Sequence, residues 1–150
     1  MVMVAGLGFR AQCGVASLRA ALNAALNAAL DAAQQAQGTH STSGSTYITL
    51  TALATAADKA SHPALLQLAA ELQLPITPVN LLKLASQAAT PSAHVPARYG
   101  AHSVAEAAAL AAAAMTVQVG PFRAHLLTPR CTSPDRLATA AIALSKNIQP

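Results

Sequence analysis

The chain opens with Val2-Met3-Val4-Ala5-Gly6-Leu7-Gly8-Phe9-Arg10, and this stretch decides the fold. Its first part, Val2–Leu7, is a short apolar run with β-branched residues that ends at Gly6 and Gly8, which is typical of a buried first strand. The glycines predict a backbone that turns tightly and can come close to a ligand. With Arg10 beside them and a helix N-terminus following, the loop is suited to hold a carboxylate or a phosphate. An ordinary strand-to-helix turn with a solvated arginine is the alternative.

The segment after this loop has a leucine at every fourth position, at Leu18, Leu22, Leu26 and Leu30. Each step of four residues advances about 40° beyond a full helical turn, so the leucines spread over roughly 120° of a helix surface. That width suits packing against a sheet. A zipper-like partner helix fits less well, because the strict 3.5-residue seam is missing.

Strand and helix signals alternate along the rest of the chain. The predicted strands are Tyr47–Leu53, which the exit loop Ala54–Ala60 follows, Ile76–Val79, and closing strands within Thr116–Val119, Ala124–Leu127 and Ala138–Leu144. The predicted helices run from Ser61 and Pro63 through Leu72, from Asn80 through Ala85, and from a cap formed by Ser103 and Glu106 to near Ala114.

This alternation predicts an α/β fold, a three-layer α/β/α arrangement with a mixed, mostly parallel sheet and a terminal antiparallel hairpin. The 150 residues are the size of one domain, which we place at 1–150. In such sheets, ligands bind beyond the carboxyl ends of the strands. The loops expected to form a site are therefore Gly8–Gly14, Ala54–Ala60 and Asn80–Gly100.

Composition narrows the class of protein. Apolar residues make up 53% of the chain, yet no window of about 18 to 20 residues is continuously apolar. The N-terminus also lacks the basic region of a secretory signal, so we expect a cytoplasmic protein that does not bind a membrane. The net charge is +4 and the nine Lys and Arg residues are scattered singly. This pattern argues against nucleic acid as a partner and favours a small polyanionic ligand.

Several familiar sites are not expected. Gly6-x-Gly8-x-x-Ala11 fits a relaxed dinucleotide-binding fingerprint, but the second strand begins near residue 47, too late to supply the acidic residue that this site needs. We therefore expect no cofactor. The five histidines are dispersed, which argues against a metal site. Cys13 and Cys131 lack CxxC spacing, and two free thiols are expected.

Four polar side chains outside the first loop are candidates for a site. Lys59 follows the second strand and should share an edge with Arg10, although a solvated lysine pairing with Asp58 is the simpler interpretation. Thr90 and Ser92 offer two hydroxyls around a proline, a pattern that an ordinary turn also explains. Glu106 is a weak candidate for a catalytic acid or base, because its place three residues after Ser103 is explained by a helix cap.

Six segments also match a known family in order and spacing. They are Gly6-Leu7-Gly8-Phe9-Arg10, Ala54-Thr55-Ala56-Ala57-Asp58-Lys59, Leu72-x-Leu74-Pro75, Thr90-Pro91-Ser92 with Gly100, Val104-Ala105-Glu106-Ala107-Ala108-Ala109-Leu110 and Thr139-Ala140-Ala141-Ile142-Ala143-Leu144. Together they resemble the CobE and CbiG C-terminal domain family of cobalamin (vitamin B12) biosynthesis along nearly the whole chain. Within that family the chain looks most like the stand-alone CobE-type members of the aerobic pathway.

The chain departs from the family pattern at two positions. Phe9 stands where the family often has a cysteine, and Ala11 stands where it often has a second basic residue. A nucleophilic thiol at residue 9 is therefore not supported, and this shifts the expectation for the loop from covalent chemistry to binding.

The resemblance implies a role at the corrin-ring stage of cobalamin biosynthesis. Its intermediates, the precorrins, are tetrapyrroles with many carboxylates, which a basic protein attracts. The leading hypothesis is a protein that binds or transfers a precorrin. The expected ligand-binding residues are Gly6, Gly8, Phe9, Arg10, Lys59, Thr90, Ser92 and Arg98.

Two further functions stay open, and the sequence does not decide whether the protein is an enzyme. One is a hydrolase that acts on a precorrin-5-type lactone with release of acetaldehyde, using Glu106 or a histidine. The other is a docking subunit whose alanine-leucine helix contacts other cobalamin-pathway enzymes, in particular the methyltransferases.

Overall fold

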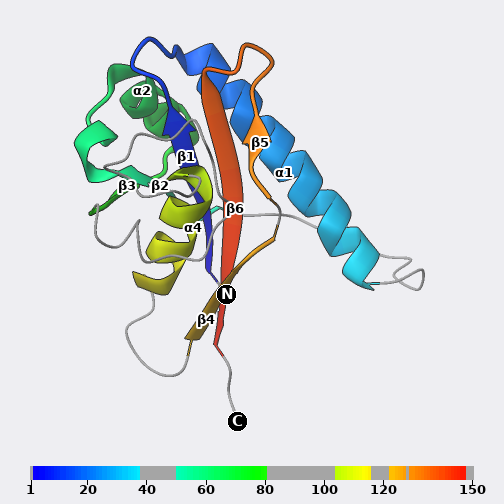
Figure 1. Cartoon of the computed structure of the whole chain (residues 1–150). Coiled ribbons are helices and arrows are strands. Elements are labelled where there is room, and N and C mark those ends of the chain that lie inside the picture. The colour runs from blue at the N-terminus through cyan, green and yellow to red at the C-terminus, as the bar shows by residue number, and fades with distance from the viewer. Residues whose placement is uncertain (1, 38–49, 81–103, 116–121, 128, 148–150) are drawn as a thin grey trace.

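The structure is a computed structural model that describes residues 2–37, 50–80, 104–115, 122–127 and 129–147 (Figure 1). Strands and helices alternate in its first half, and strands close the chain. In chain order the elements are β1 (Val2–Phe9), α1 (Val15–Gln37), β2 (Ala52–Ala56), the short 3-10 helix η2 (Ala57–Lys59), α2 (Pro63–Leu72), β3 (Ile76–Val79), α4 (Val104–Met115), β4 (Phe122–Leu126), β5 (Cys131–Thr132) and β6 (Ala138–Asn147).

The described strands form one mixed sheet in the order β3-β2-β1-β6-β4, and β5 pairs with β6 outside this path. β1, β2 and β3 are parallel to one another. β6 is antiparallel to β1, β4 and β5, so β6 runs against the direction that the other strands share. The predicted sheet, mixed and mostly parallel in strand direction, is confirmed. The antiparallel hairpin near the end of the chain is formed by β5 and β6.

Helices cover both faces of the sheet, which gives the three layers that the sequence predicts (Figure 1). On one face, α1 and α2 bury an apolar cluster with Leu7, Leu53 and Ile142 of the sheet. On the other face, α4 packs against Val4 and Ala143. Leu18 and Leu22 of α1 lie in the first cluster, and Leu26 packs against it. The leucine face of α1 therefore serves the core.

β1 is longer than the predicted first strand. It continues through Phe9 instead of ending at Leu7, because β6 pairs with it along its whole length, from Val2 opposite Ser145 to Phe9 opposite Ala138. Gly6 and Gly8 consequently belong to the strand, and the loop begins at Arg10.

The second strand lies later in the chain than predicted. Within the described residues it spans Ala52–Ala56, whereas the prediction was Tyr47–Leu53 with an exit loop over Ala54–Ala60. The prediction followed the β-branched residues. The strand is instead made mostly of alanines, which fit where all five of its residues are buried in the sheet. Residues 47–49 lie outside the described part of the chain.

Local signals placed the next two elements correctly. α2 begins at Pro63 and ends at Leu72, and β3 spans Ile76–Val79, as predicted. The remaining predictions for residues 81–103 and for Thr116–Val119, including the Ser103 cap, lie outside the described residues. None of the described helices is long and apolar enough to cross a membrane.

Gly6 and Gly8 point to the face that α4 covers. A Cβ atom at Gly6 would lie 2.0 Å from the carbonyl oxygen of Ala105 and 2.6 Å from the backbone nitrogen of Ala109. At Gly8 it would lie 2.9 Å from Oγ1 of Thr139 and 3.4 Å from the nitrogen of Ala105. The glycines therefore let α4 lie directly on β1, with its first turn beside the carboxyl end of the strand.

Candidate functional site

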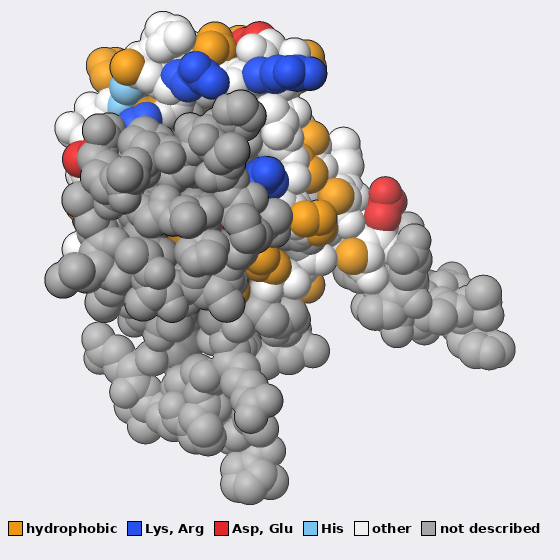
Figure 2. All heavy atoms as spheres, in the orientation of Figure 1, with side chains coloured by type: hydrophobic (Ala, Val, Ile, Leu, Met, Phe, Trp, Pro, Cys, Tyr) orange, Lys and Arg blue, Asp and Glu red, His pale blue; other side chains and the backbone are white. Residues whose placement is uncertain are grey.

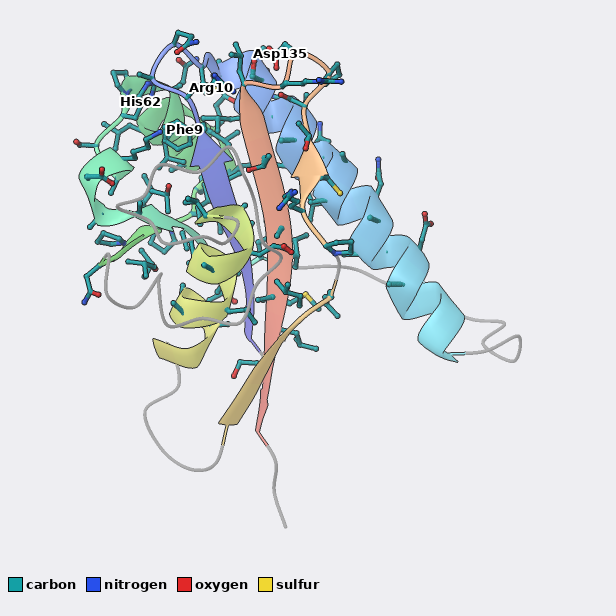
Figure 3. The ribbon with its side chains drawn as sticks, in the orientation of Figure 1. Phe9, Arg10, His62 and Asp135 are labelled. Carbon is teal, nitrogen blue, oxygen red and sulfur yellow. The ribbon has the colours of Figure 1, made fainter. Side chains whose placement is uncertain are left out.

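Arg10 is the first residue after β1, at the carboxyl end of the strand, where the sequence predicts a site. Its backbone is fixed on both sides. The Arg10 N–H donates to the carbonyl of Leu137 at 2.9 Å, and the carbonyl of Arg10 accepts from the N–H of Cys13 at 3.0 Å. The side chain is exposed. Figure 3 shows Arg10 at the tip of the first loop, at the same end of the sheet as Phe9, His62 and Asp135. Arg10 thus presents a solvent-accessible guanidinium from a constrained backbone.

Lys59 lies at the same edge, as predicted, and contacts the end of β1. Its Nζ donates a hydrogen bond to the carbonyl oxygen of Phe9. The same ammonium lies 5.3 Å from the centroid of the Phe9 ring, within the range of a cation–π interaction. Lys59 therefore places a positive charge one residue away from Arg10 while holding the end of the strand.

Phe9 packs into the protein. Its side chain is 6% exposed and belongs to the core cluster on the α1 and α2 side. The Phe9 ring meets the His62 ring edge to face, with centroids 5.0 Å apart and an angle of 70°. This contact accounts for an aromatic residue at position 9, and contact of Phe9 with a ligand stays a prediction.

His62 joins α2 to the first loop. Its Nδ1 accepts the N–H of Ala64 at 3.2 Å, so the imidazole caps the N-terminus of α2. Its Nε2 lies 2.8 Å from the carbonyl oxygen of Ala11. Since Nδ1 acts as an acceptor, the ring proton belongs on Nε2, which donates to Ala11. The carbonyls of Phe9, Arg10 and Ala11 are thus all bound by other parts of the chain.

The loop between β5 and β6 forms the other side of this edge. The Asp135 carboxylate accepts hydrogen bonds from Ser17 Oγ of α1, from Ser133 Oγ at 2.5 Å and from the Leu137 N–H at 3.1 Å. The bond from Ser133, followed by those from Ser17 and the backbone, holds the pKa of Asp135 below its usual value. Arg136 adopts a left-handed backbone conformation, φ 61°, and is exposed. The loop therefore orients Leu137, whose carbonyl binds Arg10.

Basic side chains gather at this end of the molecule. Figure 2 shows Lys and Arg side chains along its upper edge, above the ends of β1 and β6. We call Arg10, Lys59 and Arg136 the basic edge. A surface with exposed guanidinium groups is suited to bind carboxylates or phosphates.

The structure brings together only part of the predicted site. Phe9, Arg10 and Lys59 lie at one edge, and Gly6 and Gly8 lie in β1 beneath α4. Thr90, Ser92 and Arg98 lie outside the described residues. Glu106 is fully buried in the first turn of α4. Ligand binding by the glycines and catalysis by Glu106 stay predictions.

Sequence reasoning missed His62, Asp135 and Arg136. His62 directly precedes the helix-start proline, which is the position of an N-cap, but histidine is not among the usual capping residues. Ser133 and Asp135 have the spacing of a local side-chain turn, and this signal was available. The contacts from Ser17 to Asp135 and from His62 to Ala11 span much of the chain, so no local pattern predicts them.

The two cysteines are free thiols, as predicted. Cys13 is buried before α1, and burial is the main cause that raises the pKa of its thiol. Burial also raises the pKa of Cys131. Among the described residues, no three His, Cys, Asp or Glu side chains come together as metal ligands.

Comparison with protein families gives a match over residues 3–143 to a family described as "Cobalamin synthesis G C-terminus", CbiG_C. The chain belongs to the CbiG C-terminal family. The resemblance found in the sequence is therefore confirmed, and the coarse function with it: the chain is a cobalamin biosynthesis protein of the CbiG and CobE family.

Solved structures of two such proteins are similar to this chain. One is CobE, a protein from the cobalamin (vitamin B12) biosynthetic pathway, at 32% identity and a TM-score of 0.70, covering 97% of this chain and 93% of CobE. The other is the cobalamin biosynthesis protein chiG from Agrobacterium tumefaciens str. C58, at 33% identity and a TM-score of 0.55, covering 95% and 98%. A comparison with curated protein sequences gave no match.

Proposed function

We propose that this CbiG-family chain binds a precorrin-type tetrapyrrole through the ligand's carboxylates at the basic edge, and holds or transfers it during corrin-ring assembly. The observation that carries the proposal is the presentation of Arg10. Its side chain is exposed at the carboxyl end of β1, while its backbone N–H and carbonyl are both bound within the protein. A fixed backbone lowers the entropic cost of ordering a binding residue.

The charges of the basic edge support a carboxylate-bearing ligand. Arg10 and Arg136 are exposed, and Lys59 lies between β2 and α2 beside the end of β1. Asp135 brings a negative charge to the same edge, but its oxygens accept hydrogen bonds from Ser17, Ser133 and Leu137. This carboxylate is thus committed to the loop. The net charge of +4 acts in the same direction over a longer range.

The experiment is a titration of the purified protein with a precorrin, or with uroporphyrin as a stable polycarboxylate probe, followed by visible absorption. We expect a spectral change at micromolar protein and a dissociation constant about tenfold higher, or more, in Arg10→Ala, because a charge-assisted hydrogen bond is lost. Arg19→Ala is the matched control. Arg19 is also an exposed arginine, but it pairs with Glu71 between α1 and α2. No spectral change, or equal affinities in all three proteins, would refute the proposal.

A hydrolase that opens a precorrin-5-type lactone and releases acetaldehyde is the second candidate. The supporting observation is the position of Glu106, which is fully buried in the first turn of α4. The backbone nitrogen of the adjacent Ala105 is close to Gly8, near the carboxyl end of β1. Acetaldehyde release by the wild type, lost in Glu106→Gln, would support this function over binding alone.

A further inference from the structure

Arg130 carries a donor that has no hydrogen-bond partner among the described residues. Its side chain is partly buried, and its Nη1 atom is buried with no hydrogen-bond partner in the structure of the described residues. Burying one nitrogen of a charged guanidinium without a hydrogen bond is costly. Such a group in a native protein calls for an explanation, and a bound anion is one.

Few carboxylates of the chain are available as a partner of Arg130. It has five Asp and Glu residues, and all five belong to the described part. Glu71 pairs with Arg19, and Asp135 accepts hydrogen bonds within its own loop. Asp31 on α1 and Asp58 in η2 are exposed. Glu106 in α4 is the acidic residue that could pair with Arg130 in place of a bound anion, and the experiment has to test this pairing.

The register of β5 indicates where the Arg130 side chain lies. Cys131 is opposite Ala140, and both contribute to the cluster under α1. Side chains alternate along an extended chain, so Arg130, one residue earlier, is directed to the face that α4 covers. On that face, Gly8, Thr139 and Thr132 pair in a row across β1, β6 and β5.

This surface is suited to a ligand group. The residues of the row are small, and Gly8 is next to the first turn of α4, whose helix dipole favours negative charge. Two strand spacings, about 9.6 Å, separate β1 from β5. Arg130 itself is in line with Ala141 of β6 and Gly6 of β1, on the face of the sheet where the N-terminal part of α4 packs, and both of these residues are small.

We propose that Arg130 forms a second carboxylate-binding position, on the α4 face of β5, which contacts the same ligand as Arg10. Leu137, which precedes β6 and accepts the N–H of Arg10, is four residues from Ala141, which is in line with Arg130. These four steps span about 13 Å along the strands, and with the two strand spacings across the sheet the backbones of Arg10 and Arg130 are about 16 Å apart. Two arginines at this separation suit a ligand with carboxylates on different sides of a large ring. The inference rests on the proposed function for the identity of the ligand, but the anion site can be tested by itself.

The first test uses citrate as a small polycarboxylate at constant ionic strength. We expect citrate to raise the melting temperature of the wild type and to have less than half this effect on Arg130→Met. Without citrate, Arg130→Met should melt no lower than the wild type, because the substitution removes a buried charge that lacks a partner. A structural arginine would behave in the opposite way, and its loss would lower the melting temperature.

The second test uses uroporphyrin and separates this inference from the proposed function. Arg130→Met should raise its dissociation constant roughly tenfold or more, whereas Arg19→Met should not. If the wild type does not bind uroporphyrin, the proposed function fails, and the citrate comparison still decides on Arg130. If Arg130→Met does not fold, Arg130→Gln replaces it.

Two results would overturn the inference. The first is equal binding of citrate and uroporphyrin by wild type and Arg130→Met. The second is that Arg130→Met and Glu106→Gln, each without ligand, lower the stability by the same amount, and that the double variant is no less stable than either single variant. This result would identify Glu106 as the partner of Arg130.

Discussion

His62 Nε2 lies 2.8 Å from the carbonyl oxygen of Ala11, and this contact joins α2 to the loop that presents Arg10. The same ring caps α2 through Nδ1. One side chain thus connects the start of a helix to the edge where we place the ligand. Any change at His62 has two separable consequences, one for the helix and one for the loop.

His62→Ala should lower the free energy of unfolding by about 1–2 kcal/mol, because the cap and the bond to Ala11 are both lost. His62→Asn is the matched variant. Asparagine is a good N-cap, so it should recover the capping part but not the bond to the loop. Urea unfolding measures the stability, and amide hydrogen exchange at Cys13 reports on the loop. Equal stability in both variants would contradict a capping role.

Gly6→Ala should be strongly destabilising. The added methyl group would lie 2.0 Å from the Ala105 carbonyl oxygen, so α4 would have to move away from β1. Overpacking of this kind costs about 1–3 kcal/mol or more. Gly14→Ala is the control, since a Cβ there has nothing within 4 Å. It should cost about 1 kcal/mol at most, through its place before α1. Similar losses in the two variants would refute close packing as the reason for Gly6.

Elements with strong local signals were predictable. Pro63 fixes the start of α2, and the short run Ile76–Val79 between a proline and a polar residue gives β3. β2 was misplaced because alanines carry no strand signal of their own, and only burial in the sheet explains their place. Local propensity is a weak guide where tertiary packing decides.

The site was predictable only in its position. The order of strands and helices directs attention to the carboxyl end of β1, and Arg10 and Lys59 are both there. The sequence does not reveal that Gly6 serves α4, because this contact joins residues about a hundred positions apart. The bond from Ser17 to Asp135 has the same character. Such pairs depend on the assembled fold.

The thiols should differ in reactivity. Burial raises the pKa of Cys13 and of Cys131, so both should be protonated and slow to react at pH 7. Cys131 is the more accessible and should be alkylated first. Cys13 should react only when the protein is unfolded. Iodoacetamide labelling with and without urea, read by peptide mass spectrometry, measures this order. Rapid labelling of Cys13 in the native protein would contradict its burial.

Asp135 should support stability in a pH-dependent way. Its pKa is lowered in the folded protein, mainly by the hydrogen bond from Ser133. The contribution is therefore fully present above the unfolded pKa of about 3.9 and is lost as the pH falls through the lower folded value. Asp135→Asn should be less stable than the wild type at pH 7, and the difference should shrink below about pH 4. Urea midpoints from pH 7 to pH 3 test this, and a constant difference would contradict it.

Glu71 provides a contrast, because its partner is charged. Arg19 Nη2 lies 2.5 Å from Glu71 Oε2, both side chains are more than a third exposed, and the bond from Arg19 is the main cause that lowers the pKa of Glu71. Exposed ion pairs are screened by salt. Glu71→Gln should therefore destabilise slightly at low salt and hardly at all in about 1 M NaCl, where the Debye length is about 3 Å.

The effect of Asp135→Asn should persist in salt, because the partners of Asp135 are neutral hydroxyl and amide groups. Urea midpoints of both variants at the two salt concentrations distinguish these origins, and a loss of the Asp135 effect in salt would show that charge pairing stabilises this loop.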